Sequence, residues 1–175
     1  MLITRPVEIS DSAKLYYHLS NPRVVRFSRL KPASIEDMEK MIAELKVQEE
    51  ERKVIPYAIV KDEEQVGMIT LWDYCQIRRE GFLSTWLGED YWGKGLNGEA
   101  KILFLEKLFT QYKLDRVLLM IRNSNLRSIA ACSKIDYVSD LSKEEELIVR
   151  MTYNHKVEDD HILFSINKKD FLDRK

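Results

Sequence analysis

The chain has 175 residues, a hydrophobic share of 45% and a formal net charge of −1 at pH 7. This length fits one domain with a substantial core, and we expect that domain to span residues 1–175. A balance so close to neutral offers no bulk attraction to nucleic acid or to an anionic membrane surface, so we expect neither as a partner. No apolar run approaches the roughly 20 residues that a membrane-spanning helix needs.

Cysteine and histidine usage argues against metal sites and disulfides. Cys75 and Cys132 form no metal-like pair, and the three histidines, His18, His155 and His161, lack paired ligand spacing. The N-terminus does not resemble an export signal, which is basic and then apolar. We therefore expect a soluble, cytoplasmic protein without a metal.

The first part of the chain predicts a short strand and two helices. Leu2–Glu8 is β-rich, and Pro6, which lacks a donor for the ladder, places that strand at a sheet edge. Ser10 and Asp11 can cap a first helix, and Ser34 can cap a second, longer one. Between the helices lie four cations that are either solvated or part of a pocket wall, namely Arg23, Arg26, Arg29 and Lys31.

Strands dominate the middle of the chain. The runs 54–61 and 66–74 predict an antiparallel hairpin, and residues 82–87 follow as a third strand. A helix then precedes a buried strand at 116–121, and this crossover makes the strands at 82–87 and 116–121 parallel. Farther on, we expect a helix at 126–134 and a final hairpin formed by residues 147–153 and 161–166.

The stretch 82–109 combines three signals for an anion-binding device: a strand, a loop and a helix. The loop carries closely spaced glycines, at positions 88, 93, 95 and 98. Such glycines let backbone N–H groups converge, and the first turn of the following helix adds unpaired N–H groups and the positive end of its dipole. A pyrophosphate would bind there. Lys94 is either a mobile cation for this anion or a solvated loop lysine.

Two motifs carry a resemblance to a known family. The run 92–100, Trp-Gly-Lys-Gly-Leu-Asn-Gly-Glu-Ala, together with 125–129, Asn-Leu-Arg-Ser-Ile, resembles the signature of the GNAT N-acetyltransferases. The likeness is greatest to the branch that includes the ribosomal-protein N-terminal acetyltransferases. Two positions depart from the pattern: Asn97 stands where Gly or Ala is usual, and Asp136 where the helix usually ends in Gly.

The resemblance implies an α/β (α+β) GNAT fold with acetyl-CoA as co-substrate. It predicts a mixed, mostly antiparallel sheet of about 6–7 strands, split by a V-shaped cleft and flanked by about four helices. Pantetheine would insert between the strands that end at Leu87 and Ile121, and the Leu87 N–H would polarise the thioester carbonyl. The cofactor-binding residues that the resemblance implies are Thr85, Leu87, Trp92, Gly93, Lys94, Gly95, Leu96, Asn97, Gly98, Asn125 and Ser128.

Several candidate residues have two interpretations. Asn125 either contacts pantetheine or caps the helix that follows it, and one side chain cannot fully do both. Cys132 stands where many GNAT enzymes have a tyrosine that protonates the leaving thiolate, so it is either that acid or a small core residue. Ser128 and Asp140 match positions proposed to assist proton movement in the ribosomal branch, although Asp140 is one methylene shorter than the usual glutamate.

Two rival functions remain. Gly93, Gly95 and Gly98 also satisfy the G-x-G-x-x-G motif of an NAD(P)-dependent oxidoreductase. In that fold the strand runs almost directly into the first glycine of the motif, whereas here residues 89–92 intervene before Gly93. The preceding strands also look antiparallel, which does not fit a parallel dinucleotide-binding sheet. A Walker A motif is excluded because no Gly-Lys-Ser/Thr occurs. The missing tyrosine leaves open a GNAT-like module that binds acyl-CoA without catalysis.

The acceptor is the least determined feature. Likeness to the ribosomal branch suggests the N-terminal amine of a peptide or protein, and small amines such as polyamines remain the alternative. Acidic runs at 144–146 and 158–160 would attract a polycation if they face the cleft, or would simply be solvated. We also leave a homodimer open.

Overall fold

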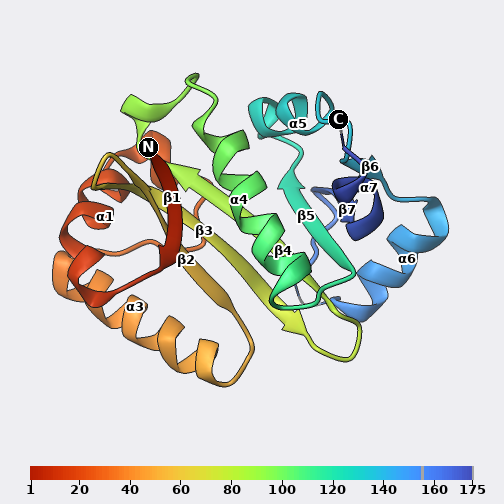
Figure 1. Ribbon diagram of the computed structural model, residues 1–175, viewed down its shortest axis with the longest axis horizontal. Helices are drawn as coiled ribbons and strands as arrows, with labels where there is room; N and C mark the ends of the chain where they lie inside the picture. The colour runs from red at the N-terminus through yellow and green to blue at the C-terminus, as the bar shows by residue number, and fades with distance from the viewer. Residues whose placement is uncertain (155, 175) are drawn as a thin grey trace.

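The computed structural model describes residues 1–154 and 156–174, which form one seven-stranded sheet with helices on both faces (Figure 1). The strand order is β1-β2-β3-β4-β5-β7-β6. The strands are β1 (Leu2–Pro6), β2 (Ile55–Lys61), β3 (Glu64–Cys75), β4 (Glu80–Leu87), β5 (Arg116–Arg122), β6 (Ser139–Asp140) and β7 (His161–Asn167). Only the β4–β5 pair is parallel among the described strands, so the predicted mixed, mostly antiparallel sheet is confirmed.

The described helices include four that have eight residues or more. These four are α1 (Ser12–Leu19), α3 (Ile35–Glu50), α4 (Leu96–Thr110) and α6 (Lys143–Thr152). The shorter helices are α2 (Pro22–Val25), α5 (Leu126–Cys132) and α7 (Lys168–Leu172). Two short 3-10 turns, Ile9–Asp11 and Glu89–Tyr91, precede α1 and the glycine loop. None of the helices in the described part of the chain combines the length and the apolarity needed to traverse a bilayer.

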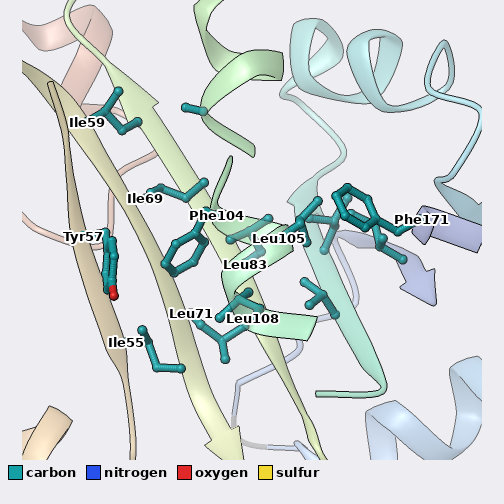
Figure 2. Close-up of a cluster of buried hydrophobic side chains, with 14 of the residues drawn as sticks. Ile55, Tyr57, Ile59, Ile69, Leu71, Leu83, Phe104, Leu105, Leu108 and Phe171 are labelled. Atoms are coloured by element: carbon teal, nitrogen blue, oxygen red, sulfur yellow. The ribbon is translucent and has the colours of Figure 1, made fainter. Parts of the chain in front are cut away.

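Helix α4 covers one face of the sheet and builds the main core. Phe104, Leu105 and Leu108 recur on one side of the helix and lie fully buried. They pack against strand residues that include Leu71 and Leu83 (Figure 2). Burial of such side chains stabilises the fold by about 1.5–3 kcal/mol each, which fixes α4 across the sheet.

The opposite face carries two separate helical layers. Met38 of α3 packs with α1 against Met68 of β3. Val149 of α6 packs with Phe82 and Leu118, at the place where β4 and β5 are paired. The candidate site lies where β4 and β5 separate, and residues of α4 and α5 also line it.

Local sequence signals explain the element ends. Pro6 lies in edge strand β1, as its missing N–H predicts. Ser34 caps α3, because its hydroxyl accepts the Asp37 N–H at 3.1 Å. Asp11 occupies the N-cap position of α1, yet its carboxylate instead accepts the Glu8 N–H at 2.9 Å and binds Arg5.

The predicted final hairpin is wrong in its first strand, because residues 143–152 form helix α6. Ser142 and Glu145 form a reciprocal capping box, and Arg150 pairs with Glu146 one turn earlier at 2.8 Å. The apolar residues that suggested a strand are mostly exposed, since only Val149 of this helix is buried. The partner of β7 at this edge is instead the two-residue strand β6.

Candidate functional site

Strands β4 and β5 separate after a short parallel pairing. Their register runs from Glu80 opposite Arg116 to Phe82 opposite Leu118 and then ends. Both strands continue beyond that point, β4 to Leu87 and β5 to Arg122. They diverge toward their carboxyl ends (Figure 1), as the resemblance predicted for a V-shaped cleft.

A cavity of about 510 Å³ opens between the diverging strands. Five of the predicted site residues line it: Thr85, Asn97, Asn125, Ser128 and Cys132. Three other charged residues that line the cavity were not predicted from the sequence, namely Lys101, Arg122 and Lys156. Of these, Lys101 was detectable, because it follows Asn97 by four residues and so shares its face of α4.

The cleft edge of β4 presents free backbone groups. The Gly88 N–H donates to the Val66 carbonyl at 2.8 Å, so this residue faces β3. Because hydrogen-bonding direction alternates along a strand, the N–H groups of Leu87 and Thr85 face the opposite edge, where pairing with β5 has ended. In addition, the Thr85 hydroxyl is buried without a partner among the described residues. This edge therefore has unused donors and acceptors for an extended ligand.

The glycine loop has the geometry expected of an anion cradle. Gly93 and Gly95 have φ of 72° and 76°, a left-handed backbone that other residues rarely adopt. Within the described residues, the N–H groups of residues 93–97 have no hydrogen-bond acceptor. A Cβ added at Gly93, Gly95 or Gly98 would meet no atom within 4 Å, so space lies beside these amides. Unpaired donors and open space together fit a pyrophosphate.

Asn97, which stands where Gly or Ala is usual in the motif, does not adopt a left-handed backbone. Gly95 is the N-cap of α4, and Asn97 lies in the first helical turn, where its side chain lines the cavity. Asp136 likewise has no positive φ. Lys94 is exposed, with Nζ 5.7 Å from the centroid of the Tyr91 ring, and both interpretations of it stay open.

Trp92 links the two sides of the open end of the cleft. Its indole N–H donates to the Leu87 carbonyl at 2.8 Å. The guanidinium of Arg127, from α5, lies 3.9 Å from the Trp92 ring centroid, and that of Arg23 lies at 5.6 Å. Such cation–π contacts contribute about 0.5–1 kcal/mol when exposed, so Trp92 is placed to hold α5 near the loop.

Asn125 caps helix α5, which was one of the two roles predicted for it from the sequence. Its Oδ1 accepts the Ser128 N–H at 3.3 Å. The amide Nδ2 has no hydrogen-bond partner among the described residues, and the side chain lines the cavity. One Asn125 side chain can therefore both cap the helix through oxygen and donate to a ligand through nitrogen.

Cys132 of α5 and Lys101 of α4 both line the cavity. Cys132 is 2% exposed, and this burial raises the pKa of its thiol, an effect that the nearby Lys101 ammonium partly opposes. Burial also lowers the pKa of Lys101. A raised pKa keeps the Cys132 thiol protonated at neutral pH, which is the form that could donate a proton.

The two proton-transfer candidates taken from the ribosomal branch are not brought together. Ser128 lines the cavity. Asp140 lies in β6, where it pairs with Phe164 of β7, and it is exposed and outside the cavity lining. Strand β7 separates it from β5, so the structure gives Asp140 no access to the cleft.

Of the two acidic runs, only Glu158 lines the cavity. Glu144, Glu145 and Glu146 occupy the first turn of α6, away from the cavity lining. Glu158, Asp160 and His161 lie close enough to hold a metal ion, but Arg122 already binds Asp160 at 3.0 Å and Glu158 at 3.7 Å. His155 lies outside the described residues.

The comparisons place the chain in a family. The family model of the acetyltransferase (GNAT) domain matches residues 1–138. This chain therefore belongs to the GNAT acetyltransferase family, as the two motifs had indicated. A search of curated protein sequences found no match.

Solved structures share the fold at low sequence identity. RimJ from Mycobacterium smegmatis, in complex with a CoA disulfide, superposes with a TM-score of 0.77 at 18% identity, covering 99% of this chain and 85% of RimJ. The RimL ribosomal N-protein acetyltransferase with coenzyme A gives 0.76 at 16%, covering 95% and 93%. Spermidine N-acetyltransferase from Vibrio cholerae, with CoA and spermine, gives 0.77 at 15%, covering 98% of each chain. This fold is not a dinucleotide-binding one, so the oxidoreductase rival loses its basis.

Proposed function

We propose that the chain transfers the acetyl group of acetyl-CoA to a primary amine by direct attack in a ternary complex. The observation that carries this proposal is the early end of the β4–β5 pairing, which leaves a free strand edge beside the cavity. Acetyl-CoA would supply an already activated acyl group. The protein then has to align the amine with the thioester, stabilise charge on the carbonyl oxygen and manage two protons.

Binding would use mainly backbone groups. The free amides of residues 93–97, at the N-terminus of α4, would hold the pyrophosphate, with the Gly98 side of the first turn leaving room for it. The edge at Thr85 and Leu87 would pair with the extended pantetheine arm, and Asn125 Nδ2 would donate to it. Leu87 N–H would also donate to the thioester carbonyl oxygen as negative charge develops there.

Proton movement would use the two sides of the cavity. The amine must lose a proton before its lone pair forms the new C–N bond, and Glu158 is the one carboxylate that lines the cavity in the described part of the chain. It would take that proton through water. As the C–S bond breaks, the leaving thiolate would be protonated by Cys132, by Ser128 or by water. In the RimL complex CoA is joined to a cysteine, and a thiol near the sulfur of CoA is what this role for Cys132 requires.

The experiment combines thermal shift with an assay of thiol release. Acetyl-CoA and CoA should each raise the melting temperature, because they bind the folded state, whereas NADH and NADPH should not. Thiol release should require an added amine, for which N-terminal peptides and small amines are both tested. Stabilisation by CoA with no thiol release for any amine would instead support a binding module, and stabilisation by NADPH alone would overturn the proposal.

A further inference from the structure

Four cations lie at one mouth of the cavity, and we call them the basic rim. They are Arg26, Arg29 and Lys31, which follow α2, and Lys156, which lies between α6 and β7. The two segments are far apart in sequence and meet only in the fold. From the sequence, the first three could be either solvated charges or part of a pocket wall, and all three line the cavity.

The basic rim is on the face of the sheet opposite α4. Side chains alternate along β3, so that Leu71 packs in the α4 core while Trp72 faces the other way. The Arg29 guanidinium lies 5.0 Å from the Trp72 ring centroid. The glycine loop leads into α4 on the first face, so phosphates bound there would not occupy the rim.

The rim retains an excess of positive charge. Asp73 binds both Arg29, at 3.4 Å, and Lys156. Within the described residues, neither Arg26 nor Lys31 has an ion-pair partner; the Arg26 guanidinium instead lies 5.0 Å from the centroid of the Phe27 ring. One carboxylate thus faces four cations. Glu158, which follows Lys156 by two residues and also lines the cavity, lies 3.7 Å from Arg122.

From this charge distribution we infer that the acceptor is an amine whose non-reacting part is anionic, and that Arg26 and Lys31 bind that anion. The inference rests on the proposed acetyl transfer and names the class of its acceptor. The ammonium group would lie toward Glu158 while the anion meets the rim. A polycation such as spermidine would meet like charge at the rim, which disfavours its encounter. An acidic N-terminal segment and a small amine bearing carboxylate or phosphate offer the same chemistry.

The test compares matched acceptors and measures binding separately from turnover. Thiol release is followed with two N-terminal peptides that differ only in Asp or Lys at positions two to four, with phosphoethanolamine, and with spermidine, at 20 and 300 mM NaCl. Binding of the two N-acetylated product peptides to the CoA-saturated protein is measured by calorimetry. The variants are Lys31→Glu and Arg26→Ser, with Lys40→Glu, an exposed position on α3 outside the cavity, as the matched charge control.

We expect kcat/KM for the acidic peptide or phosphoethanolamine to exceed that for the Lys peptide and spermidine at least tenfold at low salt. The preference should shrink at 300 mM NaCl, because exposed charges are then screened. Lys31→Glu should lower this preference for the acidic acceptor at least tenfold, mainly by raising KM. Lys40→Glu should leave the preference unchanged. Which acidic acceptor reacts identifies the source of the anion.

The outcomes separate the two proposals. Thiol release that is equal for all amines, or faster with spermidine, would overturn the anionic acceptor and leave acetyl transfer intact. The wild type could bind the acidic product, and Lys31→Glu lose this binding, while no amine causes thiol release. That outcome would support the anion-binding site and count against acetyl transfer. If the acidic product does not bind and no amine reacts, both proposals fail.

Discussion

The carboxylate of Glu80 and the guanidinium of Arg116 form a two-point contact where β4 and β5 are still paired, with N–O distances of 3.0 and 2.6 Å. The two residues are also opposite in the parallel register. Glu80 is 3% exposed, and its second oxygen accepts a hydrogen bond from the hydroxyl of Tyr153, which directly follows α6, at 2.9 Å. This contact holds β4 and β5 together at the paired end of the V-shaped cleft, and the cavity lies where the two strands separate.

Breaking this contact from one side should destabilise the protein strongly. Replacing Arg116 with Met leaves the buried Glu80 carboxylate with only Arg78, whose Nε lies 3.2 Å from its other oxygen, as a cationic partner. Removing the sole partner of a buried ion pair costs about 3–5 kcal/mol, so the loss here should be smaller. Because Arg116 is a quarter exposed and Arg78 remains beside Glu80, we expect a loss of about 2 kcal/mol in the free energy of unfolding, measured in urea. Arg79→Met, at an exposed pair with Asp115, is the control and should cost less than about 1 kcal/mol. Equal losses of unfolding free energy in the two variants would show that the buried Glu80–Arg116 pair stabilises the protein no more than an exposed ion pair does.

Gly95 provides a test of the anion cradle that separates strain from obstruction. A side chain at its φ of 76° costs about 1–2 kcal/mol, and less for Asn, which tolerates this backbone. Gly95→Val should therefore lower stability more than Gly95→Asn. Both add a Cβ to the space beside the amides, so both should weaken CoA binding several-fold by calorimetry. Normal CoA affinity in both variants would place the pyrophosphate elsewhere.

Trp92→Phe should weaken CoA binding without a large loss of stability. Phenylalanine retains a ring for Arg127 but lacks the N–H that donates to Leu87. We expect a fall of roughly 0.5–1.5 kcal/mol in stability, the value of one hydrogen bond. KM for acetyl-CoA should rise more than kcat falls, because the end of β4 loses its tether. An unchanged KM would mean that the hydrogen bond from Trp92 to Leu87 does not affect how the end of β4 binds acetyl-CoA.

The Cys132 hypothesis makes a prediction about pH. Burial raises the pKa of the thiol, so the protonated form persists at neutral pH and is lost only in the alkaline range. If Cys132 donates to the leaving thiolate, kcat should fall as pH rises through that raised pKa. Cys132→Ser should keep a donor to higher pH, and Cys132→Ala should lower kcat about tenfold or more and remove this limb. Identical pH profiles for wild type and Cys132→Ala would leave the proton to Ser128 or water.

The sequence predicted the elements that local signals encode and missed those that depend on burial. The strand, glycine loop and helix of 82–109 were visible because periodicity and glycine spacing agree. In contrast, residues 147–153 look like a strand because their apolar side chains are nearly continuous, yet Leu147, Ile148 and Met151 are exposed on α6. The Ser142 and Glu145 spacing was the signal that could have corrected this.

The site was predictable only where a motif carries it. Asn97 and Asn125 lie in motifs, and both line the cavity. Glu158 and the basic rim come from connecting segments with no pattern of their own, and long-range packing alone decides that Lys156 meets Arg29 through Asp73. Asp140 matches a family motif position but does not line the cavity, because the motif position does not determine with which strand β6 pairs.

His18 should make stability depend on pH in the mildly acidic range. Its ring is 6% exposed, Nε2 donates to the Gln65 carbonyl at 3.2 Å, and Nδ1 faces Gly88, where an added Cβ would lie 2.3 Å away. Burial, the largest cause, lowers the pKa of His18 below its usual 6.5. The unfolded chain therefore binds a proton that the folded state resists, and stability must fall as pH drops below about 6.5.

The measurement is the free energy of unfolding in urea at pH 8, 7, 6 and 5.5, for wild type and His18→Gln. The slope owed to one such group cannot exceed about 1.4 kcal/mol per pH unit. Glutamine keeps a donor for the Gln65 carbonyl but does not titrate, so its curve should be flatter below pH 6.5, although lost packing against Tyr91 lowers it at pH 8. Because Gly88 lies between β4 and the glycine loop, the same acidification should weaken CoA binding in wild type more than in His18→Gln. Parallel stability curves for the two proteins would contradict a buried, neutral His18.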